Sequence, residues 1–199
     1  MMFYSIYAES TPNPEVMKFV SNRMLADKSI EFLTDDDAKQ IPMIYKIFSL
    51  DYVESVFLSS NFISIKKKNN VEWGEVLIEI RNFITTLLNE DDIQNYTENI
   101  IIKEKKEVKS SPKNKQANTK RSHEENEIIQ ILDEYIRPAV EGDGGAIEFD
   151  SFSEGIVKVV LKGACSGCPS STLTLKSGIE SLLIQKMGEK VKEVVALNG

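Results

Sequence analysis

Cys165 and Cys168 are the residues best suited to chemistry in this sequence, and they are its only 2 cysteines among 199 residues. Two residues, Ser166 and Gly167, separate them. A secreted protein held together by disulfides would carry more cysteines, spread along the chain. Two neighbouring cysteines in an intracellular protein instead indicate metal binding or thiol redox chemistry.

The residues around this pair suit a loop that binds a soft metal through sulfur. Gly163 and Gly167 can adopt positive φ angles that other residues resist, so both thiolates can turn toward one point. Pro169 fixes φ at the expected start of a helix. Cys168 would lie just ahead of the helix N-terminus. We therefore expect the dipole of this helix to lower the pKa values of the two thiols and to stabilise bound thiolates.

The number of available ligands predicts a second chain at the site. Zinc and the common iron–sulfur clusters usually take four protein ligands, and one chain supplies two cysteines. The single histidine, His123, is expected to be a solvated or first-turn residue of a helix. Two copies related by a two-fold axis would supply four thiolates around one group. A metal or cluster bound between two chains should dissociate readily. Such lability suits a protein that carries the metal or cluster to other proteins.

Other uses of the cysteine pair stay open on these residues alone. A Cys-x-x-Cys motif before a helix also serves thiol–disulfide exchange, although there the first cysteine normally begins the helix. A structural zinc shared in a dimer satisfies the same ligand count, as does a 2Fe–2S cluster. The two cysteines could also be idle. No arrangement of acid, base and nucleophile is evident, so we expect that the protein is not an enzyme.

The elements that must position the cysteines follow from the pattern of residues 123–199. Ser122 and Glu125 predict a capping box at a helix start. The predicted buried face of that helix consists of Ile128, Ile131, Leu132, Tyr135, Ile136 and Ala139. The glycines of Gly142-Asp-Gly-Gly145 are expected to end it, since they lack the spacing of a calcium loop and the lysine of a phosphate loop.

Two strands, a helix and a final strand are expected to follow. Ile147 and Phe149 predict one strand, and Val157, Val159 and Leu161 predict the next, after a turn at residues 153–155. The cysteine loop leads into a helix over residues 170–187, stopped by Gly188. Residues 191–197 predict a last strand. The order is α-β-β-α-β.

A lysine-rich segment separates this domain from the N-terminal one. Residues 103–121 hold eight Lys or Arg against two Glu and almost no apolar side chains. Such a composition cannot bury enough surface to offset the entropy of ordering, so it predicts a disordered linker. No aromatic side chain interrupts the run to stack on bases, which weighs against nucleic-acid binding. We set the domains at residues 1–97 and 123–199, with the flexible linker at 98–122.

Residues 1–97 predict a small α+β domain. Strands are expected at residues 3–8 and 15–20, around the stiff turn Thr11-Pro-Asn-Pro14, and in a hairpin over residues 53–66. One helix is expected near residues 41–48. A second begins near Trp73, whose side chain is assigned to the core. The fold class is therefore α+β, as two small domains joined by a flexible linker.

The composition of the sequence predicts where the protein is located and which classes of partner it does not bind. A net charge of −7 disfavours nucleic acid as a partner of the whole molecule. No apolar run approaches the ~20 residues that cross a bilayer, so no membrane is expected. The first residues lack the cationic segment of a signal peptide, and Glu9 and Glu15 argue against an arginine-rich transit peptide. These features predict a cytoplasmic protein.

Two motifs of the C-terminal domain and one of the N-terminal domain resemble those of a known family. Glu141-Gly-Asp-Gly-Gly145 and Gly163-Ala-Cys-Ser-Gly-Cys-Pro-Ser-Ser171, in an α-β-β-α-β domain, resemble the C-terminal domain of NifU proteins from about residue 124 onward. Residues 1–97, with Thr11-Pro-Asn-Pro14, resemble the N-terminal domain of Nfu-type proteins. Together the resemblance covers nearly everything except the linker.

This resemblance implies an iron–sulfur cluster carrier. Cys165 and Cys168 would bind a 4Fe–4S cluster that bridges a homodimer, with an upstream scaffold as donor and apo iron–sulfur proteins as recipients. The N-terminal domain would help to select the recipient. NifU proteins of nitrogen fixation have further cysteine-bearing domains, whereas this sequence has no cysteine besides these two. The resemblance therefore implies an intermediate carrier and not a builder of clusters.

Overall fold

The computed structural model describes residues 3–90, 121–166 and 169–198. The chain divides into two compact units, one built from the elements before residue 91 and one from those after residue 120. The predicted linker, residues 98–122, lies outside the described residues except for Arg121 and Ser122. Both units combine helices with a sheet, so the predicted α+β fold class is confirmed.

The N-terminal unit is built on a five-stranded sheet whose neighbours all run antiparallel. In their order across the sheet, the strands are β1 (Ile6–Ser10), β2 (Val16–Ser21), β5 (Phe62–Lys67), β4 (Val53–Ser60) and β3 (Ala26–Phe32). The predicted strands and the β4–β5 hairpin are present. Strand β3 was not predicted, because its Asp-Lys-Ser-Ile-Glu stretch lacks apolar alternation. As an edge strand it exposes Asp27 and Lys28 to solvent.

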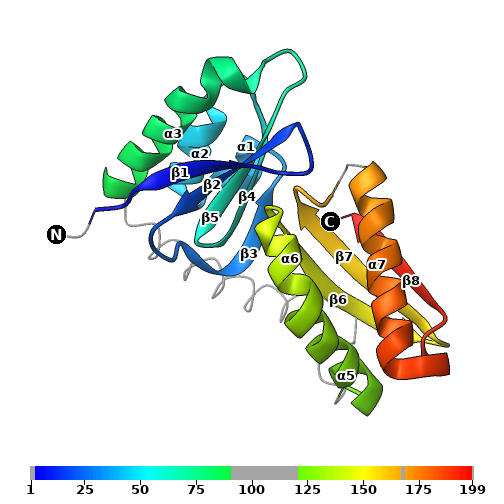
Figure 1. The fold of residues 1–199 in the computed structure, drawn as a ribbon. Coiled ribbons are helices and arrows are strands. Elements are labelled where there is room, and N and C mark those ends of the chain that lie inside the picture. The colour runs from blue at the N-terminus through cyan, green and yellow to red at the C-terminus, as the bar shows by residue number, and fades with distance from the viewer. Residues whose placement is uncertain (1–2, 91–120, 167–168, 199) are drawn as a thin grey trace. The chain divides into compact units, whose positions relative to one another are not determined.

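Helices α1 (Asp35–Ala38), α2 (Pro42–Phe48) and α3 (Trp73–Glu90) complete this unit (Figure 1). Ile44 of α2 and Ile80 of α3 are fully buried in one core with Ile63 of β5. Trp73 is half-buried against this core, as the sequence predicts. Its indole N–H donates to the Pro14 carbonyl at 3.0 Å, and its ring meets the Phe19 ring edge-on.

The C-terminal unit confirms the predicted α-β-β-α-β order (Figure 1). Its elements are α5 (His123–Ile131), the π-helical turn η1 (Leu132–Ile136), α6 (Arg137–Gly142), β6 (Gly145–Ser153), β7 (Ile156–Gly163), α7 (Pro169–Met187), the 3₁₀ turn η2 (Gly188–Lys190) and β8 (Glu193–Asn198). Strand β7 lies in the centre of the sheet, antiparallel to β6 and parallel to β8. Helix α7 supplies the crossover that a parallel pair requires.

The first helix of this unit begins as predicted, but only part of the predicted face is buried. Ser122 accepts from the Glu125 backbone N–H while the Glu125 carboxylate accepts from the Ser122 N–H, which confirms the capping box. Ile128, Ile131 and Leu132 are buried. Tyr135 and Ala139, however, are exposed, and Val140 takes the buried position.

The π-helical turn η1 explains this difference. A π turn accommodates one residue more than an α turn, so the buried face moves on by one position. Pro138 is the second residue after this turn, and a proline lacks the N–H that an α-helical bond would need. A pattern of period 3.6 therefore predicted the buried residues correctly as far as Leu132 and, in part, at Ile136, but it was wrong for Tyr135 and Ala139.

Among the described residues, no helix has the length and apolar character needed to cross a bilayer.

Candidate metal centre

Cys165 lies in the short loop between β7 and α7, and the loop backbone holds it there. Gly163 adopts the positive φ (+65°) that its place before the cysteine predicted. The Ser166 backbone N–H and hydroxyl both donate to the Gly163 carbonyl, at 3.1 and 2.9 Å. The Thr172 hydroxyl donates to the Cys165 carbonyl at 3.2 Å and joins the loop to α7. Pro169 is the first residue of α7, as predicted.

The glycine run before β6 directly contacts this loop. Gly144, at φ +82°, ends α6 as predicted, and its carbonyl accepts from the Ala164 N–H at 3.2 Å. A Cβ at Gly145 would lie 2.7 Å from the Lys162 carbonyl oxygen and 2.8 Å from the Cys165 Sγ. Residue 145 therefore has to be a glycine, because a side chain there would collide with the Cys165 sulfur in its observed position. Sequence reasoning missed this contact, although a third glycine beyond those that end a helix was a usable signal.

Burial determines the direction of the pKa shift of the Cys165 thiol. Its side chain belongs to the hydrophobic core of the unit, and the residue is 6% exposed. Burial raises the pKa of the Cys165 thiol to about 11, and the Asp143 carboxylate adds to the increase. The expected lowering by the α7 dipole is thus wrong for Cys165, because loss of hydration outweighs it. A metal that binds this sulfur must displace its proton.

The structure places only part of the predicted ligand set. Cys168 lies outside the described residues, so the pairing of its sulfur with that of Cys165 stays a prediction. Within the described ranges, no group of three or more His, Cys, Asp or Glu side chains gathers as a metal site would require. His123 is an exposed first-turn residue of α5, as predicted. Cys165 in this loop can supply one soft sulfur ligand.

Two family models match the sequence. The one described as "Scaffold protein Nfu/NifU N terminal" covers residues 6–91. The one described as "NifU-like domain" covers residues 128–195. The boundary between them falls in the lysine-rich region, and the second match contains both cysteines.

Curated relatives match along most of the chain. NifU-like protein 4, mitochondrial, of Arabidopsis thaliana is 34% identical over 191 residues, which are 92% of this chain and 63% of that protein. Two proteins named NFU1 iron-sulfur cluster scaffold homolog, mitochondrial, are similar. The one from Drosophila willistoni is 33% identical, covering 89% of this chain and 58% of its own. The human one is 30% identical, covering 89% and 66%. The chain thus spans about three fifths of the length of the first of these relatives.

Two solved structures each match less than half of the chain. A NifU-like protein from Saccharomyces cerevisiae is 27% identical, with a TM-score of 0.38, over 45% of this chain and 82% of its own. A protein from Staphylococcus aureus is 30% identical, with a TM-score of 0.35, over 40% and 96%. These TM-scores are too low to indicate a shared fold by themselves.

The relatives also correct one prediction. The sequence predicts a cytoplasmic protein, whereas these relatives from a plant, a fly and human are all named mitochondrial. The prediction of a cytoplasmic location is therefore wrong. It rested on the composition of the first residues, which is a weak guide to the compartment in which a protein works.

Proposed function

Because the chain belongs to the family that joins an Nfu-type N-terminal domain to a NifU-like domain, we propose that it carries an iron–sulfur cluster and delivers it to apo-proteins. The names of its relatives, which include "iron-sulfur cluster scaffold", support this role. The mitochondrial names extend the proposal to a mitochondrial site of action. The protein would act as a carrier and not as an enzyme.

The observation that carries the proposal is the cysteine loop. Cys165 is held between β7 and α7 by backbone hydrogen bonds, with Gly145 leaving room for its sulfur. Cys168 follows at the spacing at which cysteines often bind iron–sulfur clusters. We propose these two residues as the cluster ligands.

A second copy would complete the site. Two chains contribute four thiolates, which is the number that a 4Fe–4S or a 2Fe–2S cluster usually takes. We propose a 4Fe–4S cluster that bridges a homodimer, with a 2Fe–2S cluster as the alternative nuclearity. The cluster is cargo in this proposal, received from an upstream scaffold and passed on.

Delivery would proceed by ligand exchange. A thiolate of the recipient forms a bond to iron as the bond from iron to Cys165 or Cys168 breaks, and the released thiolate takes up a proton. The oxidation state of the iron need not change in this step. Because burial favours the protonated form of Cys165, the bond from iron to Cys165 would be replaced by a neutral thiol inside the core. The N-terminal domain would select the recipient.

Anaerobic reconstitution with iron and sulfide tests the proposal. We expect about four irons and four sulfides per dimer, a 4Fe–4S Mössbauer spectrum, and dimerisation on loading, measured by light scattering. Cys165→Ala and Cys168→Ala should each abolish the cluster. Ser177→Ala, at an exposed site on α7, is the matched control and should load normally.

Each competing function has its own result in the same experiment. A colourless dimer with one zinc would indicate a shared structural metal. A monomer that forms a reversible Cys165–Cys168 disulfide would indicate thiol–disulfide exchange. Either result would overturn the carrier function, and so would failure of the loaded protein to activate any apo 4Fe–4S enzyme.

A further inference from the structure

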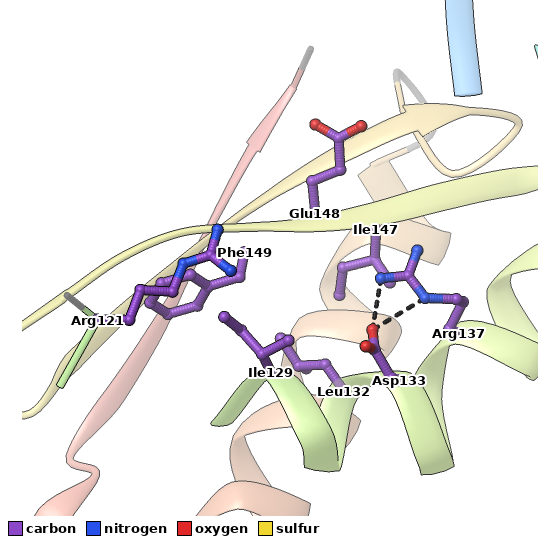
Figure 2. A pocket seen from close by; sticks show the side chains of 8 residues that line it. All are labelled: Arg121, Ile129, Leu132, Asp133, Arg137, Ile147, Glu148 and Phe149. Atoms are coloured by element: carbon purple, nitrogen blue, oxygen red, sulfur yellow. Dashed lines mark hydrogen bonds and ion pairs between the residues drawn. The ribbon is translucent and has the colours of Figure 1, made fainter. Parts of the chain in front are cut away.

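A groove lies between the first helical segment of the C-terminal unit and strand β6. It has a volume of about 280 Å³. Ile129 and Leu132 line it from the helix, and Ile147 and Phe149 line it from the strand. Four charged residues also line it: Arg121, Asp133, Arg137 and Glu148. Figure 2 shows Arg121 and Arg137 on either side of the apolar side chains.

The strand that forms one wall of the groove is an edge strand. In the C-terminal sheet the order is β6-β7-β8, so one side of β6 has no strand partner among the described residues. Three consecutive residues of β6, from Ile147 to Phe149, line the groove, although side chains along a strand alternate between faces. The three residues share a position along the outer edge of the strand. The backbone N–H and C=O groups at such an edge can pair with another strand.

The charges in the groove are unevenly paired. The Arg137 guanidinium donates to the Asp133 carboxylate at 2.9 Å, and the Lys162 ammonium donates to the Glu148 carboxylate at 2.8 Å. Both carboxylates are thus matched. The Arg121 side chain is exposed and has no carboxylate partner in the described part of the chain. Among the residues that the structure describes, Arg121 is thus the groove charge without a carboxylate partner, and it lies beside the apolar residues.

We propose that this groove binds an extended peptide segment of a partner protein by adding it as a strand to the free edge of β6. Apolar side chains of the peptide would enter between Ile129 and Phe149, and a carboxylate of the peptide would pair with Arg121. Main-chain hydrogen bonds supply affinity in such strand addition, and side-chain pockets supply specificity. The partner is therefore a protein with an exposed segment that alternates apolar and acidic residues.

The groove lies close to the cysteine loop along the same strand. A Cβ added to Gly145 would contact the Cys165 sulfur. Gly145 is two positions before Ile147, which is a separation of ~7 Å at the usual rise of a strand. A segment docked on β6 thus runs toward Cys165. If the proposed function holds, the docked protein is one that exchanges a cluster with this loop. Peptide binding itself does not depend on a bound cluster.

Selection from a phage-displayed library of random heptapeptides on the full-length protein tests this site. Synthetic copies of selected peptides are then titrated into the ¹⁵N-labelled full chain. We expect selected sequences to alternate apolar and acidic residues, and the largest amide shifts to fall in β6 from Ala146 to Phe149 and in α5. Arg121→Glu should weaken binding at least tenfold. A peptide with lysine in place of the acidic residue should regain binding to that variant.

Controls separate the groove from general charge attraction and from other occupants. Lys158→Glu makes the same charge change on β7 at an exposed residue that does not line the groove, and should leave binding unchanged. Shifts mapped elsewhere, no acidic preference, or no selected peptide would overturn the proposal. So would binding seen only after deletion of residues 91–120, which would assign the groove to the chain's own segment. Concentration-dependent β6 shifts without peptide would assign it to a second copy. A cysteine variant that binds peptide but no cluster distinguishes this site from the proposed function.

Discussion

At the scale of single residues, the contact between Gly145 and Cys165 links two motifs that are far apart in the sequence. A Cβ at Gly145 would meet the Cys165 Sγ at 2.8 Å and the Lys162 carbonyl at 2.7 Å, both far inside normal contact. The Lys162 oxygen belongs to the backbone, and the Cys165 sulfur ends a short side chain that is buried in the core. The glycine is therefore required by packing around the sulfur, in addition to any role in ending α6.

Gly145→Ala should therefore affect both stability and cluster loading. We expect a loss of about 1–3 kcal/mol in the free energy of unfolding, as for other overpacked cores. We also expect fewer irons per dimer after reconstitution, because the methyl group pushes on the ligand sulfur. Urea denaturation and iron analysis measure the two effects.

Gly142→Ala is the matched control for this change. Gly142 is the last residue of α6, and a Cβ there would meet no atom within 4 Å. We expect this variant to be unchanged or stabilised by ~0.5–1 kcal/mol, since alanine loses less backbone entropy in a helix. Equal stability and equal iron loading of the two variants would show that Gly145 is not required by its contact with Cys165.

At the scale of elements, the π-helical turn η1 determines which side of α6 faces the core. Val140 is 1% exposed, whereas Ala139 is exposed. An uninterrupted α-helix through residues 128–140 would reverse these two environments. The identity of the buried residue is therefore a direct test of the turn in solution.

Val140→Ala should destabilise the C-terminal unit by about 2 kcal/mol, because it removes two buried methyl groups from the core. Ala139→Ser should cost ~0.5 kcal/mol or less, since it changes an exposed helical position. Thermal denaturation followed by circular dichroism gives both values. A larger loss for the Ala139 variant than for the Val140 variant would contradict the π turn.

The capping box offers a second test on the same helical segment. Ser122→Ala should cost about 1 kcal/mol, because it leaves the Glu125 backbone N–H without its acceptor. The neighbouring His123→Ala is the control and should have little effect, since His123 is exposed. Urea denaturation measures the change in the free energy of unfolding for both variants. Equal stability of the two variants would mean that water replaces the cap without loss.

The elements that the sequence predicts well are those that local chemistry determines. The Ser122 cap, the glycine stop after α6 and the hairpin of β4 and β5 depend on residues a few positions apart. Strand β3 was missed because an edge strand needs few apolar residues. The π turn was missed because a periodic pattern gives no sign of an inserted residue. The contact of Gly145 with Cys165 depends on the pairing of β6 with β7, which only the fold supplies.

At the scale of the whole molecule, the two units contain separate cores. The buried residues of the N-terminal unit form one cluster around Phe19 and Ile63, and those of the C-terminal unit form another around Ile128 and Val159. Each core comes from one unit alone. Both units should therefore stay folded when the chain between them is cut, so that the role of the tether can be tested separately from stability.

Cleavage at a protease site inserted after Lys115 should slow cluster delivery without changing cluster binding. The lysine-rich composition of this segment predicts a flexible tether, which would keep the cluster domain at an effective concentration of up to ~1 mM near a docked recipient. Insertion there leaves Arg121 and the Ser122 cap intact. Transfer to an apo 4Fe–4S enzyme should then lose rate at micromolar protein and regain it as the protein concentration rises. Uncut protein with the same insertion is the control. Equal rates before and after cleavage at every concentration would show that delivery needs no tether and that recipient selection lies within the C-terminal unit.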